Sequence, residues 1–447
     1  MNKKSLVMGI FVLFAIMILT ITGCGSQGGQ TQTQTPPSNP GGNTNTNTST
    51  AAPIVIGVPT ALSSIEGIDA INSVNMAVDE INAAGGVTVG NEKRPLKVVS
   101  IDTRESDAGV PVNDALTALE KLINENKPNA ILVGAFRSEI LLASMDVIAK
   151  YKIPYMTSIA MSPEFQKKVA SDPEKYKYLF RLGINSSYFA NYLGDTLGSI
   201  NKQFNYNKAY IITQDVLWAK GTGTALQKII EANGWEVVGF DSYPTGTSDF
   251  STSLSNAKNK GAQVIVPVFD MPQAGILVKQ AKTMQTPALI AGYVGPATQE
   301  TGWKTFNGEV EGLINFVYEI GAIPVKAVPK SVAYHDNYAK KYGAEQASKL
   351  SGHGAGSAYD SVYVLADAIQ RAGSLDPDAV AAAIAKTDYD GVIGKIRFTD
   401  DHQAVFGTDP KESAIGVAFQ WQAPGVRVPI FPEVAKDGEI QLPAGLK

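Results

Sequence analysis

Cysteine is the residue that this chain has least of, since Cys24 is the only one among 447 residues. One cysteine cannot close a disulfide within the chain, so we expect the hydrophobic core to hold the fold together. Histidine is nearly as scarce, and His335, His353 and His402 share no metal-like spacing with one another or with the cysteine. We therefore predict neither a metal site nor a cofactor.

A concentration of one charge sign is also missing. The 38 basic and 42 acidic residues give a net charge of −4 at pH 7, without a cluster of either sign. This excludes a nucleic-acid partner, because such binding needs a basic patch. No Gly-x-Ser-x-Gly sequence occurs, and the glycine-rich segment 352–360 lacks that spacing. A secreted hydrolase on an α/β scaffold would need this nucleophile elbow, so we do not expect an enzyme and keep the hydrolase as an alternative.

The one long apolar run spans residues 6–21 and follows two lysines. A basic start, an apolar run and small residues after it are typical of a secretion signal, which we place at residues 1–23. The string ITGC, ending at Cys24, resembles the lipobox of bacterial lipoproteins, and this resemblance implies cleavage before Cys24 and acylation of its sulfur. An uncleaved anchor helix is the alternative. Both predict a chain outside the cytoplasmic membrane, on the cell surface of a Gram-positive host or in the periplasm of a Gram-negative one.

Residues 24–52 are almost entirely Gln, Thr, Asn, Gly, Ser and Pro. Such a segment cannot bury enough apolar surface to offset its chain entropy, so it is predicted to be a disordered tether. The remainder, 53–447, is too long for one ordinary core, which favours two domains.

Strands and helices alternate along the rest of the chain. Apolar strands are expected at 54–58, 96–101 and 130–133, with helices at 67–84, 112–126 and 139–151. The pattern starts again with strands at 208–212, 235–240, 264–268 and 287–291 and helices at 223–233, 250–260 and 272–284. The tail predicts helices at 332–342, 356–372 and 378–386 and strands at 394–398 and 415–422. This alternation predicts an α/β fold of two similar lobes, each a doubly wound parallel sheet with helices on both faces.

Ligands of open α/β sheets bind beyond the carboxyl ends of the strands, so the loops after the strands supply the candidate residues. From these loops we select Ser64, Glu66, Phe136, Arg137, Ser138, Ser158, Ala160, Met161, Trp218, Phe269, Asp270 and Tyr293. Ser138 stands where a helix begins and is either part of an anion site or an ordinary N-cap. Arg137 either pairs with a carboxylate or is solvated.

The other candidates are also open at this stage. Trp218, Phe269 and Tyr293 either wall the site or belong to the core. Glu66 and Asp270 either accept an ammonium group or lie in water at the rim.

Several strings of the chain are similar, in their order, to the extracytoplasmic solute-binding proteins of ABC importers in the leucine/isoleucine/valine-binding group. They are MAVDEINAAGGV (76–87), GAFRSEILLASMDVIAKYKIPYMTSIAMSPEF (134–165), QDVLWAKGTGTAL (214–226), AYDSVYVLADAIQRAG (358–373) and GVAFQW (416–421). The resemblance implies a type I periplasmic-binding fold with a three-crossing hinge near Gly183, Tyr318 and Phe406. It places lobe I at 53–183 and 319–405, and lobe II at 184–318, with 406–447 completing lobe II and the hinge.

The family's ligand residues carry over only in part. Ser138 matches the serine that grips a ligand carboxylate, and Ala160 matches the backbone position that assists it. Met161 stands where the family usually has a threonine, and Trp218 stands for its aromatic wall. The acid that usually holds the ammonium group has no clear counterpart, since Gly292-Tyr293-Val294 occupies its place.

The missing acid leaves two accounts of the ligand. Either Glu66 or Asp270 replaces the acid from another loop, or the ligand has no amino group, because a buried ammonium without an acceptor is costly. The resemblance implies a monomeric, lipid-anchored receptor that captures a branched-chain or other amino acid and delivers it to a permease and ATPase in the membrane. An aromatic or aliphatic carboxylate, an amide or urea is the alternative ligand, and a ligand sensor is the alternative role.

Overall fold

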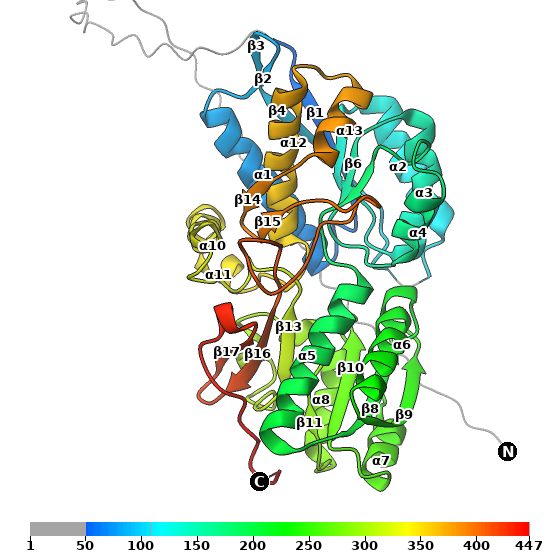
Figure 1. Ribbon diagram of the computed structural model, residues 1–447, viewed down its shortest axis with the longest axis vertical. Coiled ribbons are helices and arrows are strands. Elements are labelled where there is room, and N and C mark those ends of the chain that lie inside the picture. Colours follow the sequence, from blue (N-terminus) through cyan, green and yellow to red (C-terminus); the bar gives the residue numbers. More distant parts are fainter. Residues whose placement is uncertain (1–50, 108, 447) are drawn as a thin grey trace, which may run out of the picture. The chain divides into compact units, whose positions relative to one another are not determined.

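The computed structural model describes residues 51–107 and 109–446. The predicted secretion signal, Cys24 and most of the predicted tether therefore lie outside the described residues. All described residues belong to one compact unit, whose helices and strands are labelled in Figure 1. Within them, no helix combines the length and the apolar character needed to cross a membrane.

The first sheet has five parallel strands in the order β4-β1-β5-β6-β7. They are β1 (Ile54–Thr60), β4 (Leu96–Asp102), β5 (Ala130–Val133), β6 (Tyr155–Thr157) and β7 (Leu179–Arg181). The helices on this side are α1 (Ile65–Ala83), α2 (Val112–Asn126), α3 (Ser138–Tyr151), α4 (Glu164–Ser171), α10 (Pro329–Tyr342), α11 (Ala344–Ala347), α12 (Ala355–Ala372) and α13 (Pro377–Ala385). Two small hairpins accompany them, β2–β3 (Val87–Val89, Glu92–Arg94) and β14–β15 (Tyr389–Gly391, Gly394–Ile396).

Helices cover β1 so closely that it is buried along most of its length. α2 approaches Gly57 so tightly that an added Cβ would lie 2.7 Å from the Leu122 side chain. On the opposite side of the sheet in Figure 1, α1 and α12 lie side by side although almost 300 residues separate them. Burial on both faces explains why the strands are nearly continuous apolar runs.

The second sheet is also parallel, in the order β11-β10-β8-β9, with β12 pairing to β10. Its strands are β8 (Lys208–Gln214), β9 (Glu236–Tyr243), β10 (Val264–Phe269), β11 (Leu289–Ile290) and β12 (Tyr293–Val294). Its helices are α5 (Ser186–Phe204), α6 (Leu217–Ala232), α7 (Ser251–Asn259), α8 (Ala274–Thr283), η1 (Gly295–Ala297) and α9 (Gly302–Thr305). The two parallel sheets confirm the predicted α/β fold.

A third, antiparallel sheet joins the C-terminal strands to this second side. It contains β13 (Ile314–Val317), β16 (Val417–Gln422) and β17 (Val426–Phe431), followed by η2 (Glu433–Ala435). A single bridge between Ala291 and Ile314 connects it to the second sheet. Between β13 and β16 the chain returns to the first side to form α10 to α13, so each side is built from two segments that are separate in the sequence.

Most predicted elements occur close to their predicted bounds, and α2 and β5 have the bounds expected. Gly85 and Gly86 end α1 as predicted, both at positive φ (99° and 84°), and the Gly86 amide donates to Ile81 O at 2.9 Å. Only glycine adopts this backbone region without a steric cost. Gly373 likewise caps α12 at φ 60°.

Several helices differ from expectation, since α4, α9 and α11 were not predicted and neither α5 nor the start of α6 was. α6 starts at Leu217, six residues before the predicted start at Gly223, because buried side chains continue at Trp218, Thr222, Leu226 and Ile230. α5 was not predicted at all, although Asn185 caps it by accepting from the Tyr188 amide at 2.8 Å. Its two glycines lower helix propensity, yet Gly194 is needed where α6 approaches, since an added Cβ would lie 2.8 Å from Ile229.

Candidate ligand-binding site

A cavity opens where loops of the first sheet face loops of the second. It amounts to about 310 Å³, part of it open to solvent, and it is lined by Glu66, Phe136, Ile159, Met161, Trp218, Asp270, Tyr293, Tyr318 and His353. Phe136 follows β5, Ile159 and Met161 follow β6, and Asp270 follows β10. These are carboxyl ends of parallel strands, where ligands of open α/β sheets bind.

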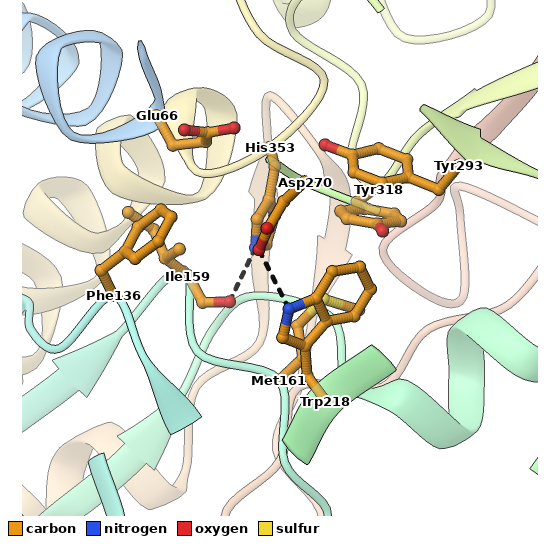
Figure 2. Close-up of a pocket in the computed structure, with 9 residues that line it drawn as sticks. All are labelled: Glu66, Phe136, Ile159, Met161, Trp218, Asp270, Tyr293, Tyr318 and His353. Atoms are coloured by element: carbon orange, nitrogen blue, oxygen red, sulfur yellow. Dashed lines mark hydrogen bonds between the residues drawn. The ribbon is translucent and has the colours of Figure 1, made fainter. Parts of the chain in front are cut away.

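Aromatic rings form one wall of the cavity (Figure 2). Tyr293 and Tyr318 are stacked, with ring centroids 4.2 Å apart and an interplanar angle of 20°. Trp218 meets both edge-on, at 6.2 and 6.4 Å. The three rings hold one another in place, so this wall is built before any ligand arrives.

Two carboxyl groups from opposite sides enter the cavity. Glu66 comes from the first turn of α1, and burial raises its pKa to about 7, with Asp270 adding to the rise and its own backbone amide opposing it. Burial also raises the pKa of Asp270, while its acceptance of hydrogen bonds works in the other direction. The Trp218 indole donates to Asp270 at 3.0 Å. In both cases burial outweighs the opposing effects, which include the nearby charge of His353.

His353 contributes the only basic group among the lining residues, and its charge is balanced within the protein. Its Nε2 lies 2.7 Å from Ile159 O and its Nδ1 lies 3.3 Å from Glu319 Oε2. Burial disfavours the charged ring, but Glu319 outweighs it, and the pKa of His353 is raised. Glu319 also accepts from Ser357 Oγ at 3.1 Å and from the Gly354 amide.

The loop between β5 and α3 is held in an unusual conformation. Val133 has φ +67°, rare for a β-branched residue, and the Gly134 amide donates to Leu132 O at 2.8 Å. This tight γ-turn is strained. The Tyr155 hydroxyl accepts the next amide, that of Ala135, at 2.9 Å.

Glu105 binds the following two amides of the same loop. Its Oε2 accepts from Phe136 N at 2.8 Å and from Arg137 N at 2.7 Å. Burial raises the pKa of Glu105 to about 7, although these amides favour its charged form. Two backbone amides directly before α3 are thus already bound by a carboxyl group of the chain.

Ser138 and Arg137 do not line the cavity. Ser138 is the first residue of α3, not its N-cap, and its buried Oγ accepts from the Ser162 amide at 3.1 Å. The Arg137 guanidinium pairs with Glu139 at 2.5 Å and donates to Val110 O at 2.9 Å. Their predicted contact with a ligand carboxylate stays a prediction.

Four further candidates also lie outside the cavity lining. Ser64 caps α1, with its Oγ accepting from Gly67 N at 2.9 Å. Ser158 and Ala160 are buried beside the lining residue Ile159, and Phe269 packs in the core against Phe250. The structure therefore brings together Glu66, Phe136, Met161, Trp218, Asp270 and Tyr293 from the predicted set.

Sequence reasoning did not select Ile159, Tyr318 or His353 as ligand residues. Tyr318 directly follows β13, a strand that was not predicted, so its loop was not considered. His353 lies just before α12, and only its place in the glycine-rich segment 352–360 indicated a loop.

The two parallel sheets and the cavity at their strand ends define a two-sided α/β binding protein. A family model described as periplasmic binding protein matches residues 53–408, and the chain belongs to this family. The family consists of solute-binding proteins of transporters, not enzymes.

Among curated relatives, Leu/Ile/Val-binding protein homolog 8 of Brucella abortus is 25% identical and the match covers 83% of this chain and 87% of that protein. The leucine-, isoleucine-, valine-, threonine- and alanine-binding protein of Pseudomonas aeruginosa is 26% identical, over 73% of this chain and 79% of its own length.

Solved structures share the fold. A branched-chain amino acid transporter substrate-binding protein, LivJ of Streptococcus pneumoniae, crystallised with isoleucine, has a TM-score of 0.67 at 21% identity and covers 85% of this chain and 100% of its own. A solute-binding protein of R. palustris in complex with benzoate has a TM-score of 0.68 at 14% identity, over 87% and 98% of the two chains.

Proposed function

We propose that this protein is the substrate-binding component of an ABC importer, which captures a small solute between its two sides and delivers it to a membrane permease. The observation that supports this most directly is the cavity at the strand ends, to which Glu66 contributes from one side and Asp270 and Trp218 from the other. Membership of the periplasmic binding protein family agrees with this role.

The solute that the relatives' names favour is a branched-chain or other amino acid. An amino acid requires partners for its side chain, its ammonium group and its carboxylate. The cavity supplies an apolar wall for the first and carboxylates that accept the second. The alternative ligand, a carboxylate, requires a positive partner. Among the lining residues only His353 could carry a positive charge, and Glu319 already pairs with it, so the amine-bearing class is favoured.

Binding is coupled to closure in this proposal. The hinge crossings are placed near Gly183, Tyr318 and Phe406, with lobe I at 53–183 and 319–405. Tyr318 would then link the aromatic wall of the cavity to one of the hinge crossings. Its ring packs on Tyr293, and its amide donates to Gly352 O at 2.6 Å. A ligand that contacts both sides stabilises the closed arrangement by its differential affinity for it.

Small-angle scattering tests this function. The protein without residues 1–52 is titrated with a panel of amino acids, amines, carboxylates and amides, and melting temperature selects the compound that binds. Ligand at a hundred times its Kd should stabilise by about 2.7 kcal/mol, and the radius of gyration should fall on binding. A bound ligand without compaction would contradict closure, and turnover of the ligand would contradict the receptor role.

Anchoring at Cys24 completes the proposal for location. Acylation at this residue would hold the receptor at the outer face of the membrane, because each buried CH₂ contributes about 0.8 kcal/mol. Cys24→Ala is expected to release the protein from membranes or to leave its precursor uncleaved. Mass spectrometry of the mature N-terminus checks this, and membrane retention with normal processing in the variant would contradict the anchor.

A further inference from the structure

The cavity carries acidic and aromatic groups suited to a cation, while its one basic lining residue, His353, is already paired with Glu319. Resting on the receptor function above, we propose that the ligand is an organic cation without a carboxylate of its own, its ammonium group lying between Glu66 and Asp270 and its apolar part against the aromatic wall.

Several groups that could grip a ligand carboxylate already have partners within the protein. Glu105 accepts the two amides that precede α3, at 2.8 and 2.7 Å. The Ser138 hydroxyl accepts the Ser162 amide at 3.1 Å, and Arg137 pairs with Glu139. A second carboxylate at this place would lie beside Glu105, which is a like-charge contact in a poorly solvated site, and the nearby Arg137 cation is already paired.

The two acids that would hold a cation have no cationic hydrogen-bond partner among the described residues. Within residues 51–107 and 109–446, no side chain is hydrogen-bonded or ion-paired to the Glu66 carboxyl, whose only favourable hydrogen bond is to its own backbone. Asp270 has the Trp218 indole as a neutral donor, and the charge of His353 is matched by Glu319. The lining therefore has two acids and no uncompensated base, so a cation is the ligand that removes the cost of their burial.

The aromatic wall adds to this selectivity. The faces and edges of Trp218, Tyr293 and Tyr318 border the cavity in Figure 2, and such rings attract ammonium groups through their quadrupole. The Tyr318 hydroxyl is buried and has no hydrogen-bond partner among the described residues. A buried polar atom left unpaired beside a cavity indicates that a bound molecule completes it.

Glu66 and Asp270 lie on the two sides of the cavity, so a cation bound between them can favour closure. Glu66 lies at the start of α1 on the first sheet, and Asp270 follows β10 of the second sheet. The charge of Asp270 raises the pKa of Glu66 across the cavity, which is the direction that repulsion between the two carboxyl groups gives. A cation between them converts this repulsion into attraction from both sides, which favours the closed arrangement only when the ligand is present.

Calorimetry with four compounds that share one 3-methylbutyl chain tests the proposal. They are 3-methylbutylamine, leucine, 4-methylpentanoate and 4-methylpentanamide, which present a cation, a zwitterion, an anion and a neutral amide. Choline and glycine betaine form a second matched pair for a quaternary ammonium. We expect 3-methylbutylamine or choline to bind at least about tenfold more tightly than its carboxylate-bearing counterpart.

Two isosteric variants identify the groups responsible. Glu66→Gln and Asp270→Asn should each weaken binding of the cation by at least about tenfold, because each removes a charge partner and keeps the side chain's volume. Glu125→Gln, on the exposed face of α2, is the matched control and should leave affinity unchanged. Melting curves establish that each variant is folded, and a folded Glu66→Gln that binds the cation as the wild type does would overturn the proposal.

A pH series gives a second readout. Affinity for the cation should fall by about tenfold from pH 8 to pH 5.5, since Glu66 becomes protonated through pH 7 in the free protein. The titratable groups that influence Glu66 are Asp69 on the same helix and Asp270, His353, Tyr293, Tyr318 and Glu319 around the cavity. The dependence should be reduced in Glu66→Gln, and a wild-type affinity that rises on acidification would contradict the proposal.

The outcomes separate this inference from the receptor function. If leucine binds more tightly than 3-methylbutylamine, or betaine more tightly than choline, the cation proposal is wrong and the receptor function stands. Tightest binding of 4-methylpentanoate or 4-methylpentanamide has the same consequence. If none of the six compounds binds, the cation proposal is also wrong, and the scattering experiment with the wider panel then decides on the receptor function alone.

Discussion

At the scale of single residues, Glu105 does most to shape the site without lining it. It follows β4 of the first sheet. Its carboxyl group accepts the amides of Phe136 and Arg137, and this fixes the direction in which Phe136 enters the cavity. Its Oε1 is buried and has no partner among the described residues. The chain thus places a carboxyl group of its own next to the start of α3, where the helix dipole favours negative charge.

Glu105→Ala should therefore lower both stability and ligand affinity. Two partly buried amides lose their acceptor, which is expected to cost about 1–3 kcal/mol in the free energy of unfolding. Glu105→Gln is the matched control, because it retains one oxygen for the two amides. Urea denaturation measures the stabilities, and equal losses in both variants would show that charge, not the hydrogen bonds, is what matters.

At the scale of elements, the connection from β7 to α5 depends on a close backbone approach. A Cβ added at Gly183 would lie 2.2 Å from Ser158 O, a backbone atom that cannot move away easily. Gly198, inside α5, has no atom within 4 Å of the same position. Packing therefore requires a glycine at Gly183 but not at Gly198.

Gly183→Ala should destabilise the protein by about 1–3 kcal/mol, as overpacking does. Gly198→Ala should stabilise it by about 0.5–1 kcal/mol, because alanine loses less backbone entropy in a helix. Denaturant midpoints of the two variants measure this difference. If Gly183→Ala leaves the free energy of unfolding unchanged, the backbone at this crossing can move away from the added methyl group without an energetic cost.

Helices and strands could be predicted where the local sequence pattern agrees with the packing that the tertiary structure requires. α2 was predicted to the residue because Ala115, Leu119 and Leu122 repeat at helical spacing and Pro128 follows its end. α5 was missed because its glycines reduce the helical signal, and Gly194 is there for contact with α6, the next helix along the chain. The start of α6 was missed for the same reason, since Gly223 makes room for Phe240 of β9.

At the scale of the whole molecule, buried carboxyl groups dominate the expected response to pH. Burial raises the pKa of Glu66, Asp69, Glu105 and Asp360 to about 7. Between their unfolded pKa near 4 and about 7, the folded protein binds more protons than the unfolded chain, so stability rises as pH falls through 7. His335 and His402, whose pKa values burial lowers, oppose this below their unfolded pKa near 6.5.

The ligand-free protein should accordingly melt at a higher temperature at pH 6 than at pH 8, with a gain of roughly 2–5 kcal/mol in the free energy of unfolding. Glu66→Gln should stabilise the protein at pH 8 and reduce the difference between the two pH values, since it removes one buried charge and no hydrogen bond to another side chain. Scanning calorimetry at matched ionic strength measures both. A higher melting temperature at pH 8 would mean that these carboxyl groups are better solvated than their positions indicate.

The sequence by itself determined the class of fold and the loops in which the site would lie, because apolar strands alternating with helices must form covered parallel sheets, and loops after such strands meet at one edge. It also singled out Glu66 and Asp270 as the acids that could replace the one missing from the family pattern. Only the tertiary structure decided which charges are already matched, as with Glu105 on the loop amides and His353 with Glu319. These pairs join residues tens of positions apart in the sequence, and their long-range geometry leaves no local pattern that could be read in advance.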